Sequence, residues 1–124
     1  MDILVLQEKI ECLLSSVRKL LPIEFNASVY VDNYSQLNES IHKQINELYP
    51  LRGKTPEQDA SLCIALLMGY SVSMYANPDD ETKKYSVLLR SQKLLRNLSP
   101  SPLKKQLSNI CEEFKESCSI NYKF

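Results

Sequence analysis

The stretch that comes closest to a chemical motif is Gly53-Lys54-Thr55, which matches the last three residues of a nucleotide-binding P-loop. A P-loop requires another glycine five positions before the Gly-Lys pair, and that position holds Leu48. The chain contains only two glycines, so its backbone offers no flexible phosphate cradle. We therefore interpret Thr55 as a helix cap and expect neither a nucleotide nor another cofactor.

The other reactive side chains lack the partners that catalysis or metal binding requires. His42 is the only histidine, and we place it at the edge of an apolar helical stripe, at or near the surface. The four cysteines form no C-x-x-C pair, and we interpret them as small buried hydrophobic residues: Cys12, Cys63, Cys111 and Cys118. The sequence predicts no metal site and no catalytic residue, so we expect a protein that is not an enzyme.

Length and composition predict one globular domain over residues 1–124, because the chain has 124 residues, of which 44% are hydrophobic and 24% charged. The first residues do not resemble a signal peptide, since Asp2 stands where positive charge is expected and Glu8 interrupts the apolar stretch. The longest apolar run, Leu62 to Tyr70, is too short to cross a bilayer. We expect a cytoplasmic protein that does not contact a membrane.

Charge is distributed unevenly, although the net charge is zero. Residues 1–81 carry twelve acidic and six basic side chains, whereas residues 82–111 carry seven basic side chains and no acidic one. Segregation of this kind suggests a polar partner surface, and a solvated helix face is the alternative explanation.

Apolar spacing predicts two amphipathic helices in the first half of the chain. Steps of three and four residues run from Leu6 to Leu20 and again from Tyr34 to Leu48. We expect Pro22 to end the first of these helices, because a proline interrupts helical hydrogen bonding.

Three later helices are each predicted to begin at a capping residue followed by proline, a combination that suits the first helical turn. These pairs are Thr55-Pro56, Asn77-Pro78 and Ser101-Pro102. Gln58, three residues after Thr55, completes a capping box. The third helix, from Pro56 to about Ala76, is apolar around most of its circumference and is expected to be buried on several sides. The sequence therefore predicts an all-α fold, a compact bundle of about five helices around a buried third helix.

Two cationic surfaces are candidates for binding a partner. One is the turn before the third helix, with Tyr49, Arg52 and Lys54, and Arg52 has the alternative role of pairing with Glu57 or Asp59 to fix the turn. The other lies on the fourth helix, where at about 100° per residue four basic side chains fall within an arc of about 140°. These four are Lys83, Arg90, Lys93 and Arg96. The fourth helix has few aromatic side chains to stack on bases, which favours a protein partner over nucleic acid.

The stretch "LYPLRGKTPEQDASLCIALLMGYSVSMY", Leu48 to Tyr75, resembles the UpxZ family of bacterial transcription regulators. The similar parts are LYPLRGKT, the acidic first turn that follows it, LCIALLMGYS, and Tyr75 before Asn77. A weaker likeness continues to about Leu98, so the UpxZ-like core spans residues 48–98.

The resemblance implies a regulator of capsular polysaccharide loci that acts by binding. Members of the UpxZ family antagonise the NusG-like, UpxY-type antitermination factors of other loci. The partners implied are such a factor and the RNA polymerase complex that it engages. The alternative function is a nucleic-acid-binding helical regulator that uses the basic fourth helix.

Overall fold

The computed structural model describes the backbone of residues 2–25, 31–72 and 79–118, and side chains within residues 2–19, 36–71 and 79–113. Five helices form in this part of the chain: α1 (Ile3–Phe25), α2 (Val31–Leu48), α3 (Pro56–Val72), α4 (Asp80–Leu95) and α5 (Pro102–Cys118). The predicted all-α fold is confirmed.

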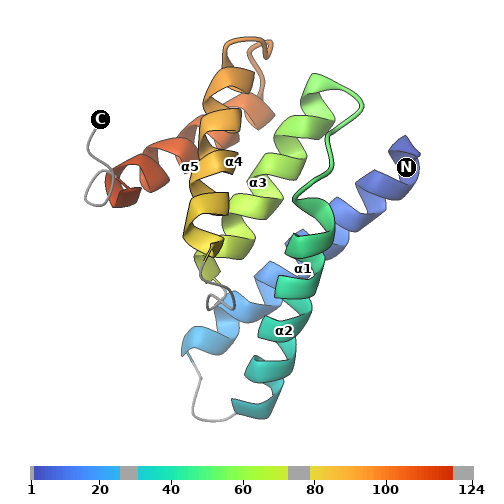
Figure 1. The fold of residues 1–124 in the computed structure, drawn as a ribbon, viewed down its shortest axis with the longest axis vertical. Helices are drawn as coiled ribbons and strands as arrows, with labels where there is room; N and C mark the ends of the chain where they lie inside the picture. The colour runs from blue at the N-terminus through green and yellow to red at the C-terminus, as the bar shows by residue number, and fades with distance from the viewer. Residues whose placement is uncertain (1, 26–30, 73–78, 119–124) are drawn as a thin grey trace.

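Helix α3 is the centre of the bundle. It contacts each of the other four helices, while α1 packs on α2 and α4 packs on α5. Figure 1 shows the result, with α3 between the α1–α2 pair and the α4–α5 pair. Every residue from Leu62 to Leu67 is buried, so this helix has no solvated face over nearly two turns. The prediction that the third helix is buried on several sides is therefore confirmed.

The apolar stripes of α1 and α2 also lie where their spacing places them. In α1 the buried residues are Leu6, Ile10, Leu13 and Val17. In α2 they are Ile41, Ile45 and Leu48. Gly69 of α3 lets α2 approach closely, because a Cβ atom there would lie 2.7 Å from the Cδ1 atom of Ile45.

Two predicted helix boundaries are wrong. α1 continues past Pro22 to Phe25, and α2 begins at Val31, upstream of the predicted stripe. A proline removes the hydrogen bond from its own nitrogen and crowds the carbonyl of the preceding turn, but a helix can continue through it when the neighbouring bonds form. The periodic pattern marks the buried stripe and not the full length of the hydrogen-bonded helix.

The three predicted caps have different outcomes. The backbone N–H of Gln58 donates to Thr55 Oγ1 at 3.0 Å, and that of Lys104 donates to Ser101 Oγ at 3.1 Å, which confirms two of them. α4 begins two residues later than predicted, at Asp80, and its N-cap Asp79 makes no side-chain capping hydrogen bond. Asn77 and Pro78 lie outside the described residues.

Candidate partner-binding site

The turn between α2 and α3 is held against the first turn of α3 by side chains of that helix. The N–H of Gly53 donates to Asp59 Oδ1 at 2.8 Å, and the N–H of Lys54 donates to Gln58 Oε1 at 2.9 Å. Gln58 therefore caps Lys54, one residue before the position that a capping box would use. A Cβ atom at Gly53 would collide with the backbone of Asp59. A glycine is required at position 53 because the backbone of Asp59 leaves no room for a side chain. The hydrogen bonds to Asp59 and Gln58 hold the turn in a fixed position.

These hydrogen bonds remove the remaining support for a phosphate site. A P-loop binds phosphate through backbone N–H groups that point at the ligand. The N–H groups of Gly53 and Lys54 point instead toward α3, where Asp59 and Gln58 accept them. The Gly-Lys-Thr sequence is a helix-capping turn.

Asp59 joins this turn to α4. Its carboxylate forms an ion pair with the Arg90 guanidinium while it accepts the Gly53 N–H, and the Nε atom of Arg90 lies 3.4 Å from Asp59 Oδ2. Both side chains are largely buried, at 15% exposed for Arg90 and 16% for Asp59. One carboxylate thus fixes the turn, α3 and α4 relative to one another.

The two cationic surfaces predicted separately meet in one open groove of about 490 Å³. We call it the cationic groove; its lining residues are Arg52, Asp59, Ser86, Leu89, Arg90, Lys93, Leu94 and Asn97. Three of the seven nominated residues, Arg52, Arg90 and Lys93, contribute to it.

The other four nominated residues lie outside the lining of the cationic groove. The ammonium group of Lys83 lies 5.5 Å from the centre of the Tyr49 ring and 3.5 Å from Asp79 Oδ2, so Lys83 and Tyr49 contact each other. Lys54 and Arg96 are exposed.

The alternative role given to Arg52, a brace to Glu57 or Asp59, is not what the structure shows. The Arg52 guanidinium donates to the carbonyl of Leu51 at 3.1 Å, and Asp59 pairs with Arg90. Arg90 approaches Asp59 from α4 and forms the brace, which leaves Arg52 exposed at the rim of the groove.

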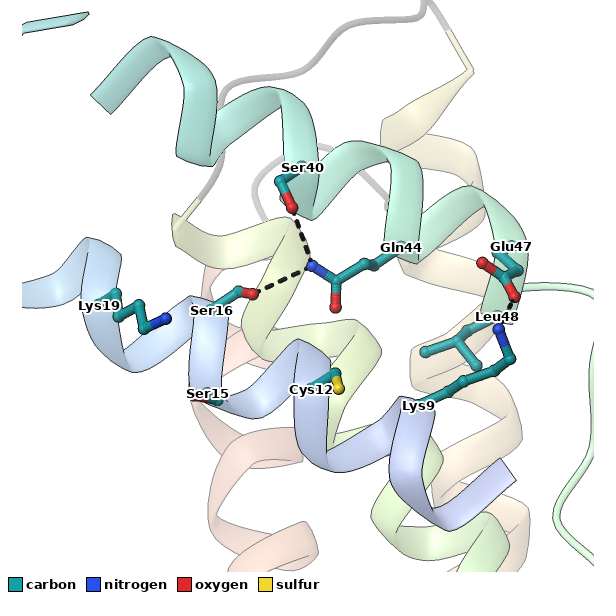
Figure 2. Close-up of a pocket in the computed structure, with 9 residues that line it drawn as sticks. All are labelled: Lys9, Cys12, Ser15, Ser16, Lys19, Ser40, Gln44, Glu47 and Leu48. Atoms are coloured by element: carbon teal, nitrogen blue, oxygen red, sulfur yellow. Dashed lines mark hydrogen bonds and ion pairs between the residues drawn. The ribbon is translucent and has the colours of Figure 1, made fainter. Parts of the chain in front are cut away.

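A second groove, between α1 and α2, was not predicted. This α1–α2 groove has a volume of about 500 Å³ and is lined by Lys9, Cys12, Ser15, Ser16, Lys19, Ser40, Gln44, Glu47 and Leu48. Figure 2 shows the Gln44 amide directed at two serines, with Gln44 Nε2 3.0 Å from Ser16 Oγ and 3.2 Å from Ser40 Oγ. Lys9 and Glu47 form an ion pair across the groove.

His42 and Cys12 are placed differently from the predictions. His42 is buried at 6% exposed, and its Nδ1 atom lies 4.0 Å from an oxygen of the buried Asp80 at the start of α4, so it does not lie at the surface. Cys12 is exposed in the α1–α2 groove, because its position on α1 faces away from the Leu13 side.

Cys63 and Cys111 are buried, as predicted. Burial raises the pKa of both thiols, and the pKa of Cys111 reaches about 11. Both are therefore neutral thiols at physiological pH. The side chain of Cys118 lies outside the described residues.

Within the described residues, no group of three or more His, Cys, Asp or Glu side chains is arranged to hold a metal ion. No helix in the same part of the chain has the length and apolar character needed to cross a membrane.

Comparison with protein families identifies the family of this chain. The model of the UpxZ family of transcription anti-terminator antagonists matches residues 10–113. The chain belongs to the UpxZ family. The match extends on both sides of the stretch, residues 48–98, from which the resemblance was read.

A solved structure supports the same assignment to UpxZ. The chain is similar to the crystal structure of a transcription anti-terminator antagonist UpxZ from Bacteroides uniformis, with 27% sequence identity and a TM-score of 0.76. The similarity covers 94% of this chain and 73% of that one. A comparison with curated proteins gives no significant match. The UpxZ family is a class of transcription regulators and not a class of enzymes.

Five lining residues of the groove that this UpxZ-family chain presents were not nominated from the sequence, and Leu89 is the exposed apolar one among them. At about 100° per residue, Leu89 falls inside the arc of basic side chains on α4 and away from the arc of Leu88. The structure confirms the difference, with Leu89 42% exposed and Leu88 3% exposed. The same helical projection that selected the cations would have found Leu89, had it been applied to the apolar residues of α4 one by one.

Proposed function

We propose that this UpxZ-family chain binds the NusG-like, UpxY-type antitermination factors of other capsular polysaccharide loci directly, and that binding blocks their action. The blocked surface is the one by which the factor engages RNA polymerase or the nascent RNA. The mechanism is occupation of a surface, and no bond is made or broken.

Family membership over residues 10–113 is the observation that carries this proposal. The family description names antagonism of an anti-terminator, and direct contact is the simplest physical means of antagonism. The cationic groove supplies a defined place for such contact, because a rigid turn and a helix together present Arg52, Arg90 and Lys93. The remaining nominated residues, Tyr49, Lys54, Lys83 and Arg96, are proposed as the periphery of the same interface.

The alternative, direct binding of nucleic acid by α4, has less support. Phosphate binding depends on how many cations neutralise phosphates. Asp59 already neutralises Arg90, and Asp79 lies beside Lys83, so α4 offers fewer unpaired cations than its sequence suggests. The groove lining also contains no aromatic side chain on which a base would stack.

A binding measurement with purified proteins tests the proposal. The full chain is titrated by calorimetry against UpxY-type factors from its own locus and from several other loci. We expect binding to factors of other loci, and we expect the double variant Arg52→Glu/Lys93→Glu to weaken it by at least about tenfold, since charge reversal at an interface costs more than 1.4 kcal/mol. Lys19→Glu is the matched control, because it reverses an exposed lysine in the α1–α2 groove.

A transcription reporter completes the test. Expression of the wild-type chain should lower read-through that depends on a UpxY-type factor of another locus, and the double variant should restore it. Absence of binding to every factor tested, with an intact helical circular dichroism spectrum, contradicts the proposal. Retained affinity in the double variant contradicts only the assignment of the groove.

A further inference from the structure

The cationic groove combines charge with an exposed apolar side chain, and this combination defines what fits it. One wall comes from the α2–α3 turn and α3, with Arg52 and Asp59. The other wall is α4, which contributes two cations and two leucines, Leu89 and Leu94.

The charges in the groove are not equivalent. Arg90 is held by Asp59, so its charge is compensated and its position fixed. Arg52 and Lys93 are both exposed, and neither forms an ion pair with any residue that the structure describes. The groove therefore has two uncompensated cations, Arg52 from the turn and Lys93 from α4, beside one compensated ion pair.

Leu89 lies on the same wall as Lys93. It is one of four large apolar side chains that are strongly exposed within the described residues, and the other three are at the start of α1, at Ile3, Leu4 and Val5. Leu94, which is partly buried against the core, also lines the groove. Burying a leucine that is already half-exposed contributes roughly 1 kcal/mol on binding.

The chemistry that complements this surface is an acidic segment that also carries an apolar side chain. Carboxylates pair with guanidinium and ammonium groups, and the apolar side chain covers the exposed Leu89. A nucleic-acid strand fits poorly, because two uncompensated cations neutralise few phosphates and the lining offers no ring for base stacking.

We propose that the cationic groove recognises an acidic segment of the partner protein that carries one apolar side chain. Its carboxylates pair with Arg52 and Lys93, and its apolar side chain packs on the exposed Leu89. This inference rests on the proposed function, because it describes how the antitermination factor is held.

Synthetic peptides test the inference on the full chain. The probe is a fluorescently labelled peptide in which one leucine is flanked on both sides by aspartates. One comparison peptide replaces the aspartates with asparagine, another replaces the leucine with serine, and a third replaces the aspartates with lysine. We expect the aspartate–leucine peptide to bind and each single replacement to weaken binding by about tenfold or more.

Variants of the chain assign the binding to the groove. Leu89→Asp and Leu89→Ser should each weaken binding of the aspartate–leucine peptide, and Leu89→Ser remains informative if the charged variant disturbs the helix. Arg52→Glu/Lys93→Glu should abolish binding of that peptide and acquire binding of the lysine peptide. Lys19→Glu should bind as the wild type does.

Several results would overturn the inference. The aspartate–leucine peptide could fail to bind, or the serine peptide could bind equally well. Leu89→Ser and Arg52→Glu/Lys93→Glu could bind the aspartate–leucine peptide as the wild type does. A single-stranded RNA oligonucleotide could bind preferentially and compete with the peptide.

The inference and the proposed function fail separately. If an antitermination factor binds the wild-type chain and the Leu89 and Arg52/Lys93 variants equally, the groove assignment is wrong while the proposed function stands. If no factor binds but the peptide series behaves as expected, the groove still recognises acidic segments and the proposed partner is wrong.

Discussion

The cationic groove and the α1–α2 groove have almost the same volume, about 490 and 500 Å³, but they are built differently. The ion pair in the cationic groove, Asp59–Arg90, is about 15% exposed on each side. The ion pair in the α1–α2 groove, Lys9–Glu47, is 36% and 48% exposed. The first holds two helices and a turn in place, whereas the second is solvated on the surface.

Their other side chains also differ. The α1–α2 groove is lined by three serines and a cysteine among longer polar side chains, and its one leucine, Leu48, is buried. The cationic groove presents its cations beside the exposed Leu89. Volume does not distinguish the two grooves. A fixed charge beside an exposed apolar side chain is what distinguishes a contact surface.

The largest expected effect comes from removing the carboxylate that fixes the cationic groove. Asp59→Ala leaves a largely buried Arg90 and the Gly53 N–H without their acceptor, and should lower the free energy of unfolding by roughly 2–4 kcal/mol. Glu47→Ala in the α1–α2 groove should cost less than about 1 kcal/mol, since the pair it breaks is exposed. Urea unfolding followed by circular dichroism measures both.

Equal losses in Asp59→Ala and Glu47→Ala would contradict the comparison, because they would mean that burial does not separate the two ion pairs. Asp59→Asn tests the geometry further, as it keeps an acceptor for Gly53 while removing the charge that faces Arg90. We expect its loss to lie between those of Asp59→Ala and the wild type.

How much of each region was predictable depends on the range of the interactions. The cap at Thr55 and the buried stripe of α1 follow from residues a few positions apart, and both were predicted correctly. The Asp59–Arg90 pair joins residues 31 positions apart, and Asp59 was matched with Arg52 because only nearby cations were considered. A one-dimensional pattern does not show which helix lies opposite, so the meeting of the turn with α4 was not predictable from spacing.

The same limit explains the errors at His42 and Cys12. The flank of an apolar stripe is exposed or buried according to what packs beside it, and α4 brings Asp80 to His42. Cys12 was expected to be buried from residue type, but its position on the helix decides its exposure. Leu89 was within reach of sequence reasoning, because a helical projection separates it from Leu88.

The pH dependence of stability tests the burial of Cys111 in the core. The pKa of Cys111 is raised by burial to about 11 from an ordinary value of 9.0. The pKa of Cys111 is higher in the folded protein than in the unfolded chain. The contribution of this thiol to the free energy of unfolding is therefore fully present below pH 9 and is lost as the pH rises toward 11. The loss is at most about 2–3 kcal/mol.

Urea midpoints measured from pH 8 to pH 11 should therefore fall more steeply for the wild type than for Cys111→Ala. Cys12→Ala, which changes the exposed cysteine of the α1–α2 groove, should follow the wild type. Parallel curves for the wild type and Cys111→Ala would show that this thiol does not titrate differently in the folded state.

The two glycines give a smaller contrast between a rigid contact and an adaptable one. A Cβ atom at Gly53 would meet the backbone of Asp59, so Gly53→Ala must move the turn and should cost roughly 1–3 kcal/mol. At Gly69 the nearest atom is the tip of the Ile45 side chain, which can rotate, and alanine gains about 1 kcal/mol in helix propensity. Gly69→Ala should therefore change stability by less than about 1 kcal/mol. Thermal unfolding of both variants tests this, and a larger loss at Gly69 would reverse the assignment of rigidity.

The smallest effect is expected at Gln44 in the α1–α2 groove. Its amide nitrogen bonds two serines, but its buried Oε1 atom accepts no hydrogen bond from the described residues. Gln44→Met keeps the length of the side chain. It loses two hydrogen bonds, which water can replace at the serines. It also removes a buried acceptor atom that is costly to leave without a hydrogen bond. These contributions oppose each other, so urea unfolding should give a change within about 1 kcal/mol. A loss above about 2 kcal/mol would mean that the Gln44 amide organises the α1–α2 groove as Asp59 organises the cationic groove, and the contrast between the two grooves would then rest on charge alone.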